Sequence, residues 1–388
     1  MKETNLFNFF FNSEKAGGLI LIACTVLSLL LANSILGTNY QHFWHTNLGG
    51  HPFEYWINDG LMTIFFLLIG LELEREIYQG ELSNIKGALL PIFGALGGMV
   101  IPVVLFLIFN FGTETQAGVG IPMATDIAFA LGILSLLGNK VPTSLKVFLT
   151  AVAVIDDLGA IIIIAIFYTK TLLWTNLLIA VSIFTLLLVL NRLKITNLIP
   201  YLIGGIAMWY FMLNSGVHAT ITGVLLAFTI PFGNGNEKSP SYILQHFLHK
   251  PVAFIILPLF ALVNTAIIIS PNIAETVTQH YSLGIALGLI IGKPLGIFLV
   301  TYLAVAFGLC KLPSDLNWKT IIGVGFLGGI GFTMSIFITL LAFDNQTVIN
   351  NAKFIILLSS LIAGTLGYIS LKLTLAKETT ETESNASR

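Results

Sequence analysis

Charged residues are scarce in this 388-residue sequence: only 10% are Asp, Glu, Lys or Arg. Ordinary soluble domains contain about 25%. Hydrophobic residues make up 56% of the chain, so an ordinary soluble fold is excluded and a protein that crosses a membrane many times is indicated. The apolar runs are continuous and do not alternate with polar residues, which predicts transmembrane helices and excludes a transmembrane β-barrel.

Cysteines and basic runs are also few. The two cysteines, Cys24 and Cys310, lie in or beside apolar runs far apart in the chain, which favours buried free thiols over a disulfide. No basic run exists that would indicate nucleic-acid binding. The first apolar run resembles the core of a signal peptide, but Glu3, Glu14 and the many later runs favour a retained first helix.

The apolar runs predict an all-α polytopic membrane protein with about twelve transmembrane helices. If the N-terminus is cytoplasmic, fifteen basic residues fall on inner segments and two on outer ones, an excess typical of the cytoplasmic side. We therefore expect a cytoplasmic N-terminus at 1–15, one membrane unit at 16–375 and a disordered cytoplasmic tail at 376–388. The predicted spans are 16–36, 58–71, 88–110, 117–137, 147–169, 172–190, 198–213, 217–231, 252–269, 283–309, 320–343 and 354–375.

Two connections are long. The outer loop 37–57 is rich in aromatic and β-branched residues, and Gly49-Gly50 in it allows the turn of a β-hairpin. The inner loop 232–251 carries His246 and His249.

Several ionisable residues are predicted to lie at one depth in the membrane. Asp156 and Asp157 stand next to each other in the apolar run VFLTAVAVIDDLGAIIIIAIFY. A charge near the bilayer centre costs at least about 2.5–3.5 kcal/mol, so such residues usually have a function. At about 1.5 Å per residue, Asp126, Lys293 and the glycine-rich segment 326–335 reach the same depth.

Two predicted spans are poor continuous helices. Span 4 contains Gly118, Gly120 and Pro122, and span 11 contains a cluster of glycines. Spans 3–5 and spans 10–12 start on opposite sides of the membrane, so they predict inverted repeats whose discontinuous helices, spans 4 and 11, cross at the midplane. The alternatives are that the glycines mark close helix packing and that Asp126 is a plain helix N-cap.

These groups can exchange a proton for a cation. Burial favours the neutral form of a carboxyl group, which then holds either a proton or a small hard cation. Thr125, Asp126, Asp156 and Asp157 offer the oxygen ligands that Na⁺ and Li⁺ prefer. Successive helical residues point about 100° apart, so one aspartate of the pair can face the ion while the other pairs with Lys293.

The motifs PMATDIAFALGILSLLG, AVIDDLGAIIIIAIFY, SGVHATITGV, LIIGKPLGI and GIGFTMSIF resemble those of the NhaA-type Na⁺/H⁺ antiporters, and the match runs from about residue 14 to 375. The resemblance implies that Asp157 is the principal carrier of ion and proton and that Asp156 pairs with Lys293. Thr125 and Asp126 would sit where the broken helices cross, with Asp126 offsetting the positive helix ends. Na⁺ or Li⁺ would bind at Asp157 and Asp156.

The resemblance also implies a bacterial inner-membrane transporter, with no enzyme activity and no cofactor. It would expel Na⁺ or Li⁺ in exchange for a larger number of external protons, electrogenically, and so regulate internal pH and sodium. We expect contact with membrane lipid and a homodimer formed through the loop 37–57. A core domain (88–169 and 283–375) and an interface domain (16–87 and 172–269) would alternate access to the ion site.

Family members are shut down at acidic pH, and a cytoplasmic cluster is implicated. The matching residues here are Glu72, Arg75, Glu76, His246 and His249. The alternative for this cluster is a solvated helix end. The midpoint of the pH response stays open because this chain has Gln245 where Glu is usual and Glu74 where Lys is common. His218 matches a family histidine, but it fits a packed core residue equally well.

Two other functions are compatible with parts of this pattern. A Na⁺-coupled symporter of an organic anion shares the general fold and would need a wider cavity. An intramembrane aspartyl protease would also place aspartates on neighbouring spans, but its GxGD motif does not occur in the sequence.

Overall fold

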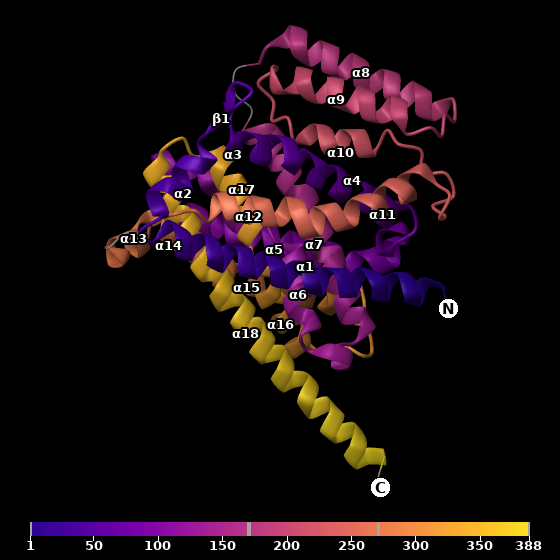
Figure 1. The fold of residues 1–388 in the computed structure, drawn as a ribbon. Helices are drawn as coiled ribbons and strands as arrows, with labels where there is room; N and C mark the ends of the chain where they lie inside the picture. Colours follow the sequence, from indigo (N-terminus) through magenta and orange to yellow (C-terminus); the bar gives the residue numbers. More distant parts are fainter. Residues whose placement is uncertain (1, 169–171, 270–271, 387–388) are drawn as a thin grey trace. The chain divides into compact units, whose positions relative to one another are not determined.

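The computed structural model describes residues 2–168, 172–269 and 272–386 and is helical apart from one two-stranded hairpin (Figure 1). Among the described residues, eight helices are long and apolar enough to cross a membrane, or up to ten if each of two bent helix pairs counts as one span. The prediction of an all-α protein with many membrane spans is therefore confirmed, with eight to ten candidate spans among the described residues. The two other predicted segments coincide with α9 (Ile199–Leu213) and α10 (Ile221–Ala227), which are shorter.

The chain divides into two compact units, and each is described by itself. The first unit comprises residues 1–22, 84–160 and 267–388, and the second comprises residues 23–83 and 161–266. The first unit contains most of α7 (Thr143–Phe167) and the N-terminal part of α1 (Lys2–Ala32). Its other elements are α5 (Ile85–Asn110), η3 (Glu114–Met123), α6 (Ile127–Ser135), η4 (Gly138–Lys140), α13 (Ile273–Thr278), α14 (His280–Leu287), η6 (Gly288–Gly292), α15 (Lys293–Ala306), α16 (Trp318–Gly328), α17 (Phe332–Ala342) and α18 (Gln346–Ala386).

The second unit begins within α1 and includes the predicted hairpin. β1 (Asn47–Leu48) pairs antiparallel with β2 (His51–Pro52), and Gly49 and Gly50 form the turn with φ of 62° and 95°, so the hairpin is confirmed. Helix α2, which precedes it in the same loop, was not predicted. The remaining elements are α2 (Gly37–Trp44), α3 (Phe53–Tyr55), η1 (Trp56–Leu61), α4 (Met62–Tyr78), η2 (Glu81–Ser83), α8 (Trp174–Arg192), α11 (Pro240–Pro251), η5 (Val252–Ile256) and α12 (Leu257–Asn264), besides α9 and α10.

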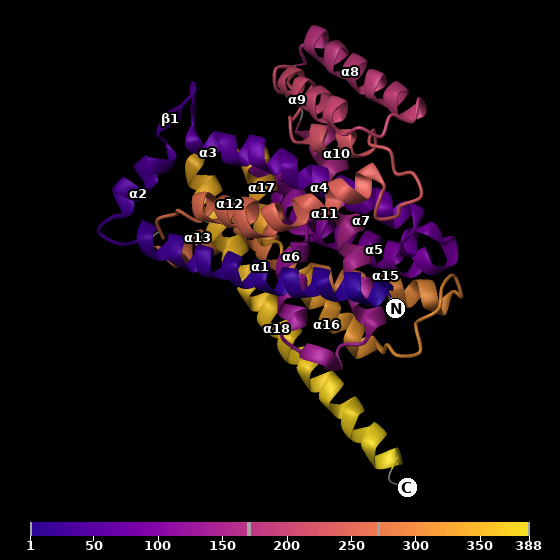
Figure 2. The same ribbon diagram turned by 45° about the vertical axis from the view of Figure 1, so that its right-hand side comes forward.

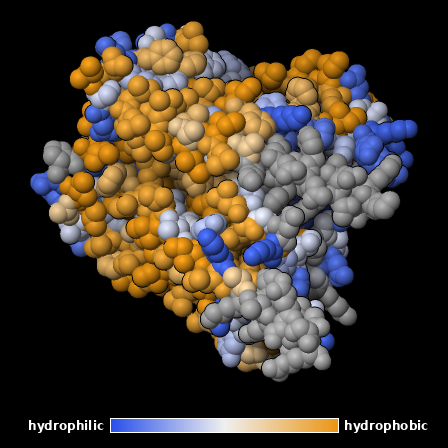
Figure 3. Space-filling model, turned by 60° about the horizontal axis from the view of Figure 1, so that its bottom comes forward, coloured by the Kyte–Doolittle hydropathy of each residue, from blue (hydrophilic) through white to orange (hydrophobic). Residues whose placement is uncertain are grey.

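Hydrophobic side chains predominate on the face shown in Figure 3, as expected for a protein surrounded by lipid. On α8, for example, Leu178 is 62% exposed and Leu186 is 57% exposed. Three ionisable side chains of the first unit, Asp156, Asp157 and Lys293, are instead 0% exposed. This inversion of a soluble protein's pattern places the ionisable residues inside the helix assembly.

Irregular backbone occurs within two of the candidate spans. The segment η3 is a 3₁₀-helix containing Pro122, and it ends at an extended residue, Ala124, before α6 begins. Helices α16 and α17 are bent by 46° at a short break, near Gly329 and Gly331. Glycine and proline both weaken helical hydrogen bonding, which explains why the chain unwinds at these two places.

Three π-helical segments, η1, η5 and η6, interrupt longer helices and were not anticipated by the apolar pattern. Segment η6 ends directly before Lys293. Neither cysteine forms a disulfide within the described part of the chain, as predicted; Cys310 is buried and Cys24 is partly exposed. The tail 376–388 was expected to be disordered, but α18 continues through it to Ala386, and residues 387–388 lie outside the described residues.

Within the first unit, α5 packs against α14. Helix α5 also packs against α15, and α16 packs against α18 (Figure 2). The backbones of α5 and α15 approach most closely at Gly97 and Gly296, where a Cβ on either residue would meet the carbonyl oxygen of the other. Glycines at both positions therefore permit the contact that places the start of α15 beside α5.

Candidate functional site

The predicted site residues of the first unit come together at the two helix breaks and the middle of α7. Thr125 and Asp126 occupy the link between η3 and α6, Asp156 and Asp157 lie on α7, and Lys293 is the first residue of α15. Asp126 is 2% exposed and the other four are 0% exposed. Three separate segments thus bring one lysine, three aspartates and a threonine into the protein interior.

The centre of this cluster is an ion pair between Lys293 Nζ and Asp156 Oδ2. The Lys293 ammonium also donates a hydrogen bond to Thr125 Oγ1 at 2.8 Å. Asp156 Oδ1, in contrast, has no hydrogen-bond partner among residues 2–168, 172–269 and 272–386. A carboxylate oxygen with free lone pairs beside an ion pair is a ligand that a cation could bind.

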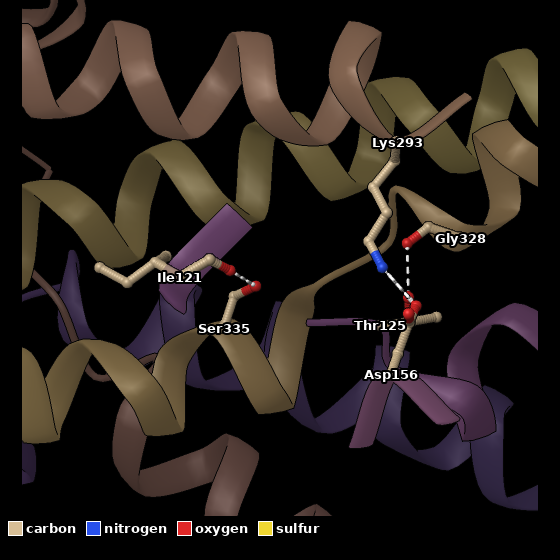
Figure 4. A network of polar contacts seen from close by, with 6 residues as sticks. All are labelled: Ile121, Thr125, Asp156, Lys293, Gly328 and Ser335. Atoms are coloured by element: carbon tan, nitrogen blue, oxygen red, sulfur yellow. Dashed lines mark hydrogen bonds and ion pairs between the residues drawn. The ribbon is translucent and has the colours of Figure 1, made fainter. Parts of the chain in front are cut away.

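The Thr125 hydroxyl lies between two acceptors. Its Oγ1 is 2.8 Å from Asp156 Oδ2 and 2.9 Å from the main-chain oxygen of Gly328, at the C-terminal end of α16 (Figure 4). A hydroxyl group carries one proton, so it donates to one of these acceptors at a time. Thr125 therefore connects the ion pair with the break between α16 and α17.

Asp126 joins the two broken helices. Its Oδ1 accepts a hydrogen bond from the main-chain N–H of Phe129 at 3.0 Å and so caps the N-terminus of α6. Its Oδ2 accepts from the main-chain N–H of Thr333 at 3.1 Å and from the Thr333 hydroxyl at 2.5 Å, in the first turn of α17. The positive ends of two helices thus face one carboxylate, which is the role that the family resemblance implies for Asp126.

Two further hydrogen bonds connect the broken segments. The main-chain N–H of Asp126 donates to the oxygen of Ile330 at 2.6 Å, and the Ser335 hydroxyl donates to the oxygen of Ile121 at 2.7 Å (Figure 4). One main-chain N–H and two main-chain oxygens at the breaks are therefore satisfied by protein atoms.

Asp157 directly follows Asp156 on α7 and is equally buried. Because successive helical residues are about 100° apart, its carboxylate points in a different direction from that of Asp156. The carboxylates of the pair and the Thr125 hydroxyl are oxygen groups of the kind that a hard cation prefers. Among the described residues, no group of three or more His, Cys, Asp or Glu side chains is placed to hold a metal ion.

Lys293 is positioned by the glycines of α5. A Cβ at Gly98 would lie 2.9 Å from Cγ1 of Ile297, so this glycine leaves room for the turn of α15 that follows Lys293. The adjacent Gly97 holds α15 close through its contact with Gly296. Sequence reasoning missed both of these glycines, and it also missed the roles of Thr333 and Ser335. Gly328 belongs to the predicted glycine-rich segment 326–335, but its contact with Thr125 was not predicted. Two features of the sequence could have pointed to these residues: the pair Gly97-Gly98 in span 3 and the hydroxyl groups of Thr333 and Ser335 in the motif FTMS.

The residues predicted to respond to pH lie in the second unit. On α4, Glu72 lies three residues before Arg75 and four before Glu76, so each of these two residues shares a face of the helix with Glu72. His246 and His249 lie on α11. His218 is placed elsewhere in this unit: its Nε2 is 2.9 Å from the main-chain oxygen of Tyr168.

The two helices of this group meet at a residue that sequence reasoning did not select. The Arg75 guanidinium lies over the ring of Tyr242, with Cζ 5.5 Å from the ring centroid. The rings of Tyr242 and His246 are parallel to within 2°, with centroids 6.1 Å apart. One aromatic ring on α11 thus contacts both the α4 arginine and a predicted pH-responsive histidine.

A helical chain with at least eight candidate spans and buried ionisable groups at helix breaks is a multi-pass membrane protein of the ion-handling class. The family model described as Na⁺/H⁺ antiporter 1 matches residues 8–371, so the chain belongs to that family and the predicted resemblance is confirmed.

Similar proteins cover nearly the whole chain. The Na(+)/H(+) antiporter NhaA of Flavobacterium psychrophilum is 76% identical over 372 residues, covering 96% of this chain and 97% of the relative. The protein named NhaA 1 of Flavobacterium johnsoniae is 64% identical, covering 96% of this chain and 98% of the relative. NhaA of Cytophaga hutchinsonii is 61% identical, covering 97% of both. These names favour antiport over the symporter alternative.

Proposed function

We propose that this chain is a secondary active, electrogenic Na⁺(Li⁺)/H⁺ antiporter that expels sodium in exchange for external protons. The observation that carries the proposal is the fully buried cluster of Asp156, Asp157, Thr125 and Lys293, in a chain that belongs to an antiporter family. Buried carboxylates that hold either a proton or a hard cation couple the two movements.

The Asp156–Lys293 pair takes part in the proposed exchange. In the proton-loaded state, Asp157 is neutral and the Lys293 ammonium pairs with Asp156. A cation that takes Asp157 and Asp156 as ligands displaces the Asp157 proton and competes with the Lys293 ammonium for Asp156. The family resemblance implies more protons than cations per cycle, so each cycle moves net positive charge.

The fold supports a finer architecture than the number of long helices alone. Counting the two bent pairs with α9 and α10 gives twelve spans, each at a predicted position. The breaks before α6 and between α16 and α17 support discontinuous spans 4 and 11 within inverted repeats, spans 3–5 and 10–12. The hydrogen bonds of Asp126 to both helix ends support a crossing of these spans at the midplane.

The two compact units support separate roles in ion binding and in dimer contact. The first unit contains all of the proposed ion ligands and would act as the core domain. The second unit contains the hairpin and would act as the interface domain. Alternating access would then change the side from which the ion ligands of the first unit are reached. We place both termini in the cytoplasm of a bacterial inner membrane, on the distribution of basic residues.

Dimerisation and pH control belong to the same proposal. The hairpin β1–β2 lies outside the candidate spans and is proposed to join two copies of the chain.

The group formed by Glu72, Arg75, Glu76, His246 and His249 is proposed to reduce transport at acidic pH. The contact of Arg75 with an aromatic residue of α11 supports a link between the two helices that carry this group.

The test uses everted membrane vesicles energised by respiration, with a fluorescent probe of the pH gradient. Adding Na⁺ or Li⁺ is expected to collapse the gradient in vesicles with the wild-type chain and to leave it intact with Asp157→Asn. Asp344→Asn is a matched control because Asp344 is an exposed carboxylate of the same unit, and it should respond as wild type does.

Two results would contradict the proposal. A wild-type response from Asp157→Asn would remove the assigned ion site. Na⁺-dependent uptake of an organic anion without proton movement would establish symport instead.

A further inference from the structure

Ile297 lies one helical turn after Lys293 on α15, on the face of the helix that carries the lysine. Its side chain is 0% exposed. A Cβ at Gly98 of α5 would lie 2.9 Å from Ile297 Cγ1, and a Cβ at Gly328 would lie 3.1 Å from Ile297 Cδ1. The isoleucine therefore fills the space that two glycines leave open, one on α5 and one at the C-terminal end of α16.

The same two glycines adjoin the polar groups of the proposed ion site. A Cβ at Gly98 would also lie 3.6 Å from Cδ of Lys293, and a Cβ at Gly328 would lie 4.0 Å from the Thr125 hydroxyl oxygen. That hydroxyl accepts a hydrogen bond from Lys293 Nζ at 2.8 Å and lies 2.9 Å from the main-chain oxygen of Gly328 (Figure 4). Ile297 is thus packed beside the polar contacts that run from the lysine to the helix break.

The polar groups next to Ile297 are able to bind a water molecule. An internal water needs roughly 30 Å³ and two to four polar partners. The oxygen of Gly328 is one such partner, and the Lys293 ammonium is another, since an ammonium carries three donors and those of Lys293 are directed to Asp156 and Thr125. Shortening Ile297 to alanine removes the side chain beyond Cβ, which opens more space than one water molecule occupies.

Water beside the lysine would weaken its pair with Asp156. An ion pair is stronger in a dry interior than in a hydrated one, because the effective dielectric constant is lower there. In the proposed antiport cycle, the cation and the Lys293 ammonium compete for Asp156. A weaker pair therefore allows the cation to bind at a lower concentration.

We propose that Ile297 is a positioning residue of the ion site: it keeps water away from the Lys293 ammonium and so sets the sodium concentration at which the cation displaces the lysine from Asp156. The proposal rests on the proposed antiport function and adds a residue that tunes its affinity for sodium. Ile297 has no polar side-chain atom, so it acts on the cation only through Lys293.

The test compares Ile297→Ala with Ile297→Val in everted vesicles at one alkaline pH, with the Na⁺ concentration varied. One added hydrogen bond corresponds to a change of about two- to tenfold in an equilibrium constant. The KM for Na⁺ is therefore expected to fall about two- to tenfold in Ile297→Ala, whereas the maximal rate per amount of protein in the membrane changes less. Ile297→Val removes only the terminal methyl group, which leaves too little space for water, and should keep the wild-type KM.

Gly98 offers a reciprocal variant. In Gly98→Ala combined with Ile297→Ala, the added methyl group occupies part of the space that the isoleucine filled, because a Cβ at Gly98 would lie 2.9 Å from Ile297 Cγ1. The double variant is expected to regain most of the wild-type KM, so the two substitutions should be non-additive.

Ile285→Ala is a matched control, because Ile285 is also 0% exposed but lies on α14, two helical turns before Lys293. It removes the same side-chain atoms and should lower stability without changing the KM for Na⁺. If Ile297→Ala does not accumulate in the membrane, Ile297→Cys replaces it as the variant with a shorter side chain.

The possible results separate the two proposals. A wild-type KM in Ile297→Ala or Ile297→Cys, or a raised one, would overturn the role of Ile297. An equal fall in Ile285→Ala would assign the effect to a general loss of packing, and a KM that stays low in the double variant would show that the opened space is not its cause; both results would also overturn it. A wild-type chain that does not respond to Na⁺ at all would instead remove the proposed antiport.

Discussion

Replacing Lys293 by methionine tests the ion pair at the centre of the site. Lys293 and Asp156 are both 0% exposed, and the ammonium contacts the Asp156 carboxylate as well as the Thr125 hydroxyl. Removing one partner of such a buried pair leaves the other charge without compensation and costs about 3–5 kcal/mol. We therefore expect Lys293→Met and Asp156→Asn each to lower the free energy of unfolding by about that amount.

The double variant is the decisive measurement. Lys293→Met with Asp156→Asn removes both charges, and uncharged side chains of similar volume are tolerated far better than a single unpaired charge. The double variant is expected to lie within about 2 kcal/mol of wild type, so the two single effects should be strongly non-additive.

Unfolding is followed in detergent by tryptophan fluorescence during titration with a denaturing surfactant. Lys319→Met serves as the control because Lys319 is an exposed lysine on α16, where substitution should change stability by less than about 0.5 kcal/mol. Additive losses in the double variant, or a single variant as stable as wild type, would show that the two side chains do not form a compensating pair.

Three further predictions concern the groups around this pair. Thr125→Val, which removes an oxygen ligand, should raise the KM for Na⁺ in the vesicle assay, and Thr125→Ser should restore it. Thr333→Val should lower stability by about 1.5–3 kcal/mol, because the Asp126 carboxylate loses a charge-assisted hydrogen bond, and Thr333→Ser should not. Gly97→Ala should destabilise the chain by about 1–3 kcal/mol, because the added methyl group meets the main-chain oxygen of Gly296.

Each of these predictions has its own contradicting result. An unchanged KM in Thr125→Val would exclude the hydroxyl as a ligand, and equal stability of Thr333→Val and Thr333→Ser would exclude the hydrogen bond. For the glycine contact the control is Gly60→Ala, since a Cβ at Gly60 would meet nothing within 4 Å. Equal effects of the two alanine substitutions would indicate a general loss of helix flexibility.

The sequence could predict where the membrane segments lie and which charged residues gather, because both follow from the cost of charge in hydrocarbon. The spans appear as long apolar runs, and Asp156, Asp157 and Lys293 interrupt such runs visibly. The irregular backbone at Ala124 and near Gly329 has a related cause, since Pro122 and the glycines weaken the local helix.

The residues that complete the site could not be predicted in the same way. Thr333 and Ser335 carry hydroxyls, which occur widely in membrane helices, so their partners become visible only when α17 is placed beside η3. Tyr242 gave no signal because an aromatic residue on an amphipathic helix usually packs against apolar neighbours. The π-helical segment before Lys293 depends on tertiary packing, which local sequence does not encode.

The Thr125 hydroxyl has one proton and two acceptors at nearly equal distance, 2.8 and 2.9 Å. Turning the O–H bond from Asp156 to Gly328 exchanges one hydrogen bond for another and moves no heavy atom. The interior of the site can therefore adapt to a change of charge on Asp156 by a single bond rotation, faster than any helix can shift. The Thr125 hydroxyl can thus respond to a new charge on Asp156 long before the helices move.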